Sequence, residues 1–141
     1  MSRAYVDANV ILRFLLDDPP EMAAAAAQLF ETAADTDLSL IVDDATVAEL
    51  VWVLKSFYKQ DIGTIAAVLR DFFLQDGVEL TDKSTILYAL TLYETKNVDF
   101  IDALLAARMQ KVGIEHVYSF DKHFDRLPNI KRLLPTVSPN T

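Results

Sequence analysis

Ala4-Tyr5-Val6-Asp7 joins a short apolar run, typical of a strand, to an acidic residue at its end. The same arrangement returns late in the chain, where Val117-Tyr118-Ser119-Phe120 runs into Asp121. In open parallel sheets, ligands bind beyond the carboxyl ends of the strands, so an acid at such a position is a candidate site residue. The two segments therefore predict both a fold class and the edge of the sheet where a site would lie.

Strand-like and helix-like segments alternate between these two runs, which predicts a parallel sheet covered by helices. The expected strands cover residues 3–7, 38–42, 78–80 and 116–120. The expected helices cover residues 9–16, 20–34, 44–58, a segment from 61 or 64 to 73, another from 82 or 84 to 95, and 99–112. A short helical turn should follow Asp121, and the tail from Pro128 onward should be irregular or hold one edge strand.

Length and composition indicate a single domain over residues 1–141. The chain has 141 residues, of which 52% are hydrophobic, and this is enough for a core without covalent staples. The absence of cysteine excludes disulfides, thiolate zinc sites and a cysteine nucleophile. No uncharged apolar run reaches the roughly 20 residues that span a bilayer, and Asp7 and Arg13 interrupt any N-terminal leader. We expect a soluble, cytoplasmic protein with no membrane contact.

Two further acids lie inside apolar helical segments. Glu49 lies within Val47-Ala48-Glu49-Leu50-Val51-Trp52, and Asp102 lies within Phe100-Ile101-Asp102-Ala103-Leu104. An isolated acid in such a segment is costly unless it is paired or binds a cation. Four acids that could converge on one point, Asp7, Glu49, Asp102 and Asp121, suggest a hard-metal site and the hydrolysis of a phosphodiester.

Each of these acids also has a simpler explanation. Asp7 and Asp121 could cap the helices that follow them, and Glu49 has the capping-box spacing from Thr46. Asp99 lies at a helix start, where the helix dipole favours an acid. Helical rotation places Glu49 on the face away from the core stripe, which favours function over packing for this residue.

The distribution of charge leaves nucleic-acid binding open. The net charge is −8 and the pI is about 4.6, which argues against binding that depends on neutralising phosphates. Residues 108–141, however, carry six Lys or Arg and three Asp or Glu, so this segment is basic. A polyanion could be held along that edge by cationic side chains, for which the candidates are Arg13, Lys55, Lys59, Arg108 and Lys122.

Four segments in order resemble the PIN domains, a family of metal-dependent ribonucleases. They are Tyr5-Val6-Asp7-Ala8-Asn9-Val10, Ala48-Glu49-Leu50-Val51-Trp52-Val53-Leu54, Asp99-Phe100-Ile101-Asp102-Ala103-Leu104-Leu105-Ala106-Ala107 and Ser119-Phe120-Asp121-Lys122-His123-Phe124. The resemblance covers about residues 3–135, and the third segment matches best. A short single-domain chain of this kind looks most like the VapC-type toxins of VapBC toxin–antitoxin pairs.

The resemblance implies a three-layer α/β/α sandwich with a central parallel sheet of four or five strands. It also implies one or two Mg²⁺ or Mn²⁺ ions, with Asp7 and Asp102 as the most direct ligands. Glu49, Asp121 and, less directly, Asp99 are the further candidate ligands, and Asn9 and Ser119 match polar positions that support the acids. The partners implied are an RNA substrate, a cognate antitoxin that fills the acidic groove, and a second copy in a homodimer.

Two alternatives stay open at the level of sequence. A catalytically degenerate PIN-like module would bind protein or RNA without cutting, although it would have no need to keep four acids. An aspartate-based phosphatase would use Asp7 as its nucleophile, but it would want a second Asp two residues later, where this chain has Asn9.

Overall fold

Helices and strands alternate along the chain in the computed structural model, which describes residues 2–137. The strands are β1 Ser2–Tyr5, β2 Leu38–Val42, β3 Val78–Leu80, β4 His116–Tyr118 and β5 Lys131–Leu133. The helices are α1 Ala8–Leu16, α2 Pro20–Asp35, α3 Asp44–Ser56, α4 Ile62–Phe73, α5 Lys83–Lys96, α6 Phe100–Val112 and the 3₁₀ helix η1 Lys122–Arg126. The predicted α/β class is confirmed. Residues 138–141, part of the expected tail, lie outside the described residues.

Local capping residues explain why the helices begin and end close to their expected bounds. Asp43 accepts a hydrogen bond from the Ala45 amide at 3.1 Å and starts α3, and Asp61 starts α4 in the same way. Gly113 ends α6 in the left-handed region, with φ of 75°, as Gly does at many helix ends. The one edge strand allowed in the tail is present as β5.

The strands form two separate parallel sheets. In the first, β2 lies between β1 and β3, with Ala4 opposite Leu40 and Leu40 opposite Val78. In the second, β4 pairs with β5. The prediction of one central sheet of four or five strands is therefore wrong, because the first sheet has three strands. An apolar run reveals that a strand exists, but the strand that it pairs with depends on contacts between distant segments.

The hydrophobic core lies between the three-stranded sheet and the helices around it. Phe30 of α2 packs on Phe14 of α1 and on Phe72 of α4, with ring centroids 4.9 and 5.1 Å apart. Leu40 and Val42 of β2 are buried in the same cluster. No helix within residues 2–137 has both the length and the apolar character needed to cross a bilayer.

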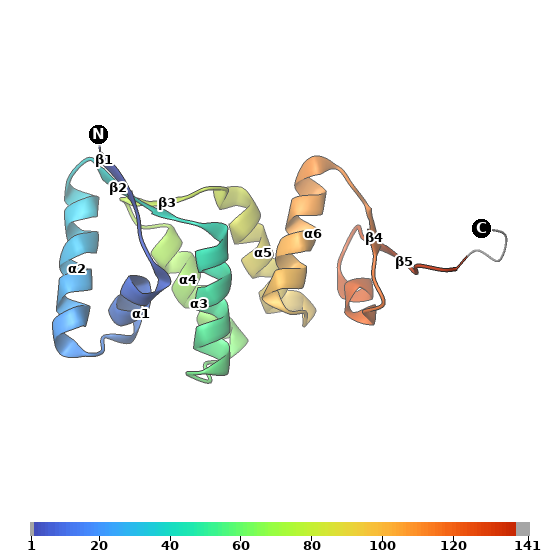
Figure 1. Ribbon diagram of the computed structural model, residues 1–141, viewed down its shortest axis with the longest axis horizontal. Helices are drawn as coiled ribbons and strands as arrows, with labels where there is room; N and C mark the ends of the chain where they lie inside the picture. The colour runs from blue at the N-terminus through green and yellow to red at the C-terminus, as the bar shows by residue number, and fades with distance from the viewer. Residues whose placement is uncertain (1, 138–141) are drawn as a thin grey trace.

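The elements β4, η1 and β5, which we call the C-terminal unit (residues 116–133), lie at one end of the molecule. Figure 1 shows α5 and α6 between this unit and the sheet that contains β1. The unit is anchored by the buried side chains of Phe124 and Leu127 and by Arg126, whose Nη1 donates to the Asn97 carbonyl at 2.5 Å.

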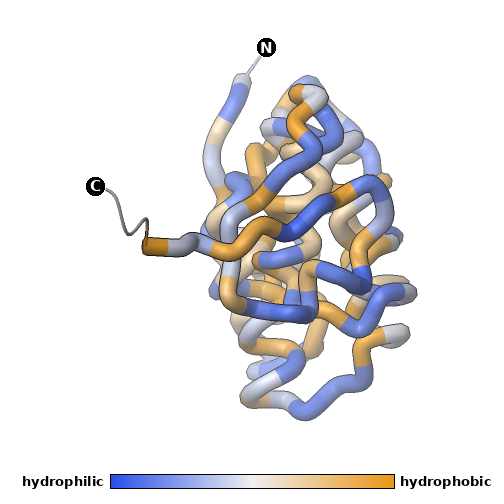
Figure 2. Tube along the Cα trace, turned by 90° about the vertical axis from the view of Figure 1, so that its right-hand side faces the viewer, coloured by the Kyte–Doolittle hydropathy of each residue, from blue (hydrophilic) through white to orange (hydrophobic). Residues whose placement is uncertain are grey.

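The strand β1 has an unusual environment for a strand with apolar residues. All four of its residues are exposed, and Tyr5 is 71% exposed. Figure 2 shows the N-terminal strand running along the margin of the molecule. Asp7 lies two residues after the end of β1, and Asp121 lies three residues after the end of β4. Each acid is the N-cap of the helix that follows.

Candidate functional site

A cleft of about 560 Å³ lies between α3, α5, α6 and the segment that follows β4. Its wall is formed in part by Ala48, Val51 and Ser56 of α3 and by Phe100 and Ile101 of α6. The side chains with chemical capability in it are Trp52, Lys55, Tyr93, Asp99, Asp102 and Asp121. Three of the five acids predicted from the sequence therefore share one cleft.

The carboxylates of Asp99 and Asp121 differ in their capping hydrogen bonds. Asp99 is the N-cap of α6, but its side chain makes no capping hydrogen bond, so its carboxylate is left for another partner. Asp121 is the N-cap of η1 and accepts a hydrogen bond from the His123 amide at 2.8 Å. The capping explanation is therefore confirmed for Asp121. Ser119 supports this turn, because its Oγ accepts a hydrogen bond from the Asp121 amide at 2.9 Å.

Asp102 lies in the first turn of α6 and is only partly exposed. Burial raises the pKa of its carboxyl, and the charges of Asp121 and Asp99 raise this pKa further. His123 lowers it. The ionised form is thus disfavoured by both its surroundings and its neighbours. A cation in the cleft would offset the repulsion from Asp121 and Asp99 and would favour the ionised form of Asp102.

Asp7 and Glu49 do not line this cleft. Asp7 is the exposed N-cap of α1 and makes no capping hydrogen bond, so capping does not account for it. Glu49 is exposed within α3, and because Asp43 caps that helix, Glu49 is not part of a capping box. Asn9 lines a separate groove of about 390 Å³ between α1 and α2. Ser119 does not line the cleft either, so four predicted site residues lie outside it.

The arrangement does not form a complete metal site. Carboxylate oxygens are suitable ligands for Mg²⁺ or Mn²⁺. Across residues 2–137, however, no three Asp, Glu or His side chains are close enough together to hold one ion. The donor chemistry of the acids therefore fits a divalent metal, whereas their positions in this conformation do not.

Tyr93 is a cleft residue that the sequence did not reveal. It is 2% exposed, and within the described part of the chain its hydroxyl has no hydrogen-bond partner. Burial raises the pKa of this hydroxyl, and the charge of Asp99 adds to the effect. In the sequence, Tyr93 is one apolar position among many on α5, so only the three-dimensional packing could identify it.

Aromatic and cationic residues complete the surroundings of the cleft. Trp52 is 66% exposed, so it does not belong to the core, and it presents an apolar ring at the cleft. Of the five cationic candidates, Lys55 lines the cleft. Arg108 instead forms an ion pair with Asp44, and the Arg13 side chain donates to the Asp18 carbonyl at 3.1 Å.

Comparison with known proteins gives two findings. The family model of the PIN domain matches residues 4–130 of this chain. The chain is also similar to a VapC ribonuclease of Aquifex aeolicus (strain VF5), with 29% identity over 122 residues that cover 86% of this chain and 90% of the relative. The range matched by the family model includes all five acids and both supporting polar residues, which the sequence had indicated as the site.

Proposed function

Because the chain belongs to the PIN-domain family, a family of nucleases, we propose that it is a metal-dependent endoribonuclease and the toxin of a type II toxin–antitoxin pair. The observation that carries this proposal is the acidic cleft, in which Asp99, Asp102 and Asp121 come together and the pKa of Asp102 is raised. The similarity to a VapC ribonuclease supports the choice of RNA as substrate.

The proposed metal is Mg²⁺ or Mn²⁺, as one ion or two. The ligands that we propose are Asp7 and Asp102, with Glu49, Asp121 and Asp99 as further candidates and with Asn9 and Ser119 in support. Since Asp7 and Glu49 lie outside the cleft, the metal site would be completed only after the acids move closer together.

The chain's own residues suggest how RNA would be held. Lys55 is a cation in the cleft and suits a phosphate, and the unpaired Tyr93 hydroxyl can donate to a phosphate oxygen. The exposed Trp52 ring can stack on a base. A scissile phosphate that must enter a cleft between helices favours an unpaired RNA segment over a duplex.

Partners and location follow from the toxin assignment. We propose a cognate antitoxin that covers the acidic cleft, a homodimer, and a cytoplasmic location. The electrostatics of the cleft support a partner that brings positive charge, because three acids face the same space.

A second candidate function has one observation in its favour. The lack of a formed metal cluster among residues 2–137 is what a degenerate PIN-like module would show if it bound protein or RNA without cutting. Calorimetric titration with Mn²⁺ distinguishes the two, because the nuclease needs a metal and the binding module does not.

The direct test uses purified, antitoxin-free protein with a pool of single- and double-stranded RNA in Mn²⁺, Mg²⁺ or EDTA. We expect metal-dependent cutting that the Asp102→Asn and Asp7→Asn variants lose. Asp71→Asn, which changes an exposed acid on α4, is the matched control and should cut like the wild type. Cutting in EDTA, or a wild type that neither cuts RNA nor binds Mn²⁺, would overturn the proposal.

A further inference from the structure

Four parallel strands each have an unpaired edge within residues 2–137: β1 and β3 in the first sheet, and β4 and β5 in the second. In the structure of residues 2–137, β1 pairs with β2 alone and β4 pairs with β5 alone. The free edge of a strand presents a row of unused backbone donors and acceptors, which is a template for another strand. Of these four edge strands, β1 and β4 carry strongly exposed tyrosines, and they lie at opposite ends of the molecule (Figure 1).

Large apolar side chains are exposed at both edges. Tyr5 of β1 is 71% exposed, Tyr118 of β4 is 69% exposed, and Phe120 just after β4 is 75% exposed. Ala4 and Tyr5 are neighbours on a strand and point to opposite faces, yet both are exposed, so neither face of β1 is covered at its end. Side chains of this kind at an open edge indicate a surface that is buried in some other state.

Helix α6 adds an apolar stripe next to the C-terminal unit. Ile101, Leu105 and Val112 are 60%, 41% and 67% exposed, respectively. At about 100° per residue, their spacings of four and eleven place all three on one face of the helix. Helix α6 therefore presents a stripe of exposed apolar side chains.

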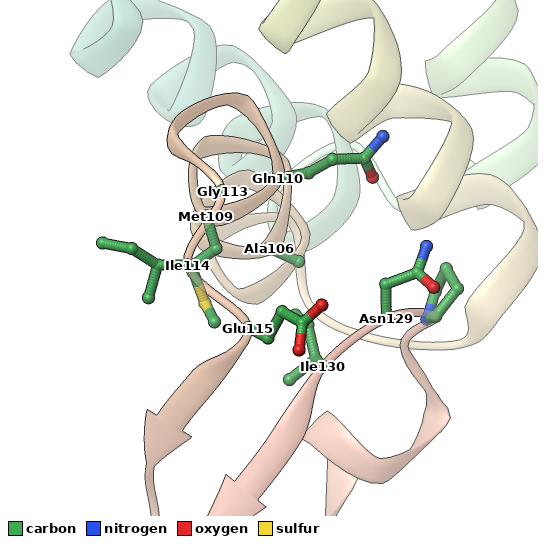
Figure 3. Close-up of a pocket in the computed structure, with 9 residues that line it drawn as sticks. Ala106, Met109, Gln110, Gly113, Ile114, Glu115, Asn129 and Ile130 are labelled. Carbon is green, nitrogen blue, oxygen red and sulfur yellow. The ribbon is translucent and has the colours of Figure 1, made fainter.

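The chain cannot easily join its own two edges. The link from α6 to β4 is Gly113-Ile114-Glu115, and three residues reach roughly 10 Å. Phe124 and Leu127 are buried in the core, so moving the C-terminal unit would expose them. Figure 3 shows that this link borders a cavity of about 240 Å³, which Asn129 and Ile130 also line. A small adjustment does not bring β4 past α5 and α6 to β1 of the same chain.

We propose that β4 of one copy pairs in parallel with β1 of a second copy, and that the exchange is reciprocal. Under a two-fold axis, β4 of each copy pairs with β1 of the other copy, so no β1 or β4 edge is left open and the assembly closes as a dimer. Each copy would contribute β3-β2-β1 to one five-stranded sheet and β4-β5 to the other. This inference rests on the proposed function where it concerns the site, because the partner copy would supply Asp7, an acid that each cleft lacks.

The pairing has a direct consequence for the acids. Asp7 follows the end of β1 and Asp121 follows the end of β4. Parallel pairing of the two strands brings their carboxyl ends to one edge. Asp7 of one copy would then lie close to Asp121 and Asp102 of the other copy. This would complete the acid cluster that a single copy does not form within residues 2–137.

Engineered cysteines test the pairing without any need for activity, because the chain has no cysteine of its own. A disulfide requires Cα atoms about 4.4–6.8 Å apart, a distance that adjacent strands provide. The Tyr5→Cys, Tyr118→Cys double variant should oxidise to a covalent dimer of about twice the 15.8 kDa chain mass. Pairing Tyr5→Cys with Val117→Cys or Ser119→Cys covers a one-residue difference in register.

The outcomes of this experiment are distinct. An intrachain disulfide, seen as a monomer of altered mobility on a denaturing gel, would show that β4 reaches its own β1 and would overturn the proposal. Failure of every pair to oxidise above the level of the control would also overturn it. The matched control replaces Tyr5→Cys with Met22→Cys, an exposed position on α2, and neither it nor the single variants should form the dimer.

Complementation between two inactive copies tests whether the site is shared. Asp7→Asn and Asp121→Asn protein are unfolded together and refolded as a mixture. In a reciprocal dimer, random mixing yields about one quarter of the sites with both acids intact, and Mn²⁺ binding should recover to that level. No recovery from variants that still cross-link would exclude a shared metal site. If the dimer cross-links but the wild type cuts no RNA, the proposed nuclease fails and the strand pairing stands.

Discussion

Asp102 shares its cleft with Asp121, and the pKa of Asp102 is raised first by burial and then by the negative charge of Asp121. A carboxyl whose pKa is higher in the folded protein than in the unfolded chain destabilises the fold once it is ionised. The ionised Asp102 therefore lowers the free energy of unfolding. Such a cost is common where a residue is kept for function and not for packing.

The first prediction follows from this relationship. Asp102→Asn should raise the free energy of unfolding at pH 7, because the folded protein no longer holds an unfavourable charge there. The gain should shrink as the pH falls towards and below 3.8, the ordinary pKa of this side chain, because the wild-type carboxyl is then protonated in both states. Thermal unfolding from pH 3 to pH 8 measures the effect, with Asp71→Asn as the control. A variant less stable than the wild type at pH 7 would contradict the prediction.

The second prediction concerns a carboxyl with the opposite shift. Lys111 donates to Asp82 at 2.8 Å, and this hydrogen bond is the main reason that the pKa of Asp82 is lowered. The interaction stabilises the fold above pH 3.8 and is lost as the pH falls through and below that value. Because both side chains are partly exposed, Lys111→Met should cost no more than about 1 kcal/mol at pH 7.

The measurement for this pair is chemical denaturation at pH 7 and again in acid. The difference between the wild type and Lys111→Met should be largest at pH 7 and smaller in acid. Lys122→Met, which removes an exposed cation at the start of η1, should change the midpoint little at either pH. Equal losses for the two variants would show that the Asp82 contact contributes nothing specific.

The third prediction compares two glycines in the same left-handed region. Gly77 has a φ of 85°, and a Cβ there would lie 2.6 Å from the backbone of Ala33 in α2. Gly113 has a φ of 75°, and a Cβ there would meet nothing within 4 Å. Gly113→Ala should therefore cost only the backbone strain of about 1–2 kcal/mol. Gly77→Ala should cost more than about 3 kcal/mol, because a helix must also move away from the sheet.

Urea unfolding of both glycine variants checks this difference. The midpoint should fall for each, and it should fall much further for Gly77→Ala. If the two variants lose the same stability, the contact between the turn at Gly77 and α2 is not as close as the structure indicates.

The fourth prediction concerns the Tyr93 hydroxyl. Tyr93→Phe removes a buried donor that has no partner within residues 2–137, so stability should stay equal or rise by about 1 kcal/mol. RNA cutting should fall roughly tenfold to a hundredfold if the hydroxyl donates to a charged phosphate, since such a bond contributes about 1.5–3 kcal/mol. Cleavage rates and melting temperatures are measured together, with Tyr58→Phe as the control. Unchanged cutting would remove Tyr93 from the substrate site.

The bounds of the helices and strands were predictable because the signals for them are local. Asp43, Asp61 and Gly113 mark ends through hydrogen bonds or backbone conformations that involve residues only a few positions away. The two-sheet arrangement was not predictable in this way. Which neighbour β4 takes depends on how residues 116–118 pack on segments far along the chain, and an apolar run contains no such information.

The candidate site was predicted in part for the same reason. Asp99 and Asp102 lie three apart on one helix, so their shared location is local, and Asp121 joins them in the cleft. Asp7 depends on the placement of β1 relative to the C-terminal unit, which the sequence does not specify. Tyr93 enters the cleft only through the packing of α5 against α6.

The exposed edge of β1 also has a consequence for protein synthesis. β1 leaves the ribosome before β4, which follows about 110 residues later, a delay on the order of 6–20 s at typical elongation rates. During that interval, the edge of β1 is open to any strand nearby, and on a polysome the nearest matching strands belong to sister chains of the same message. We expect partner copies to meet during translation, so that the first dimers would form between neighbouring nascent chains.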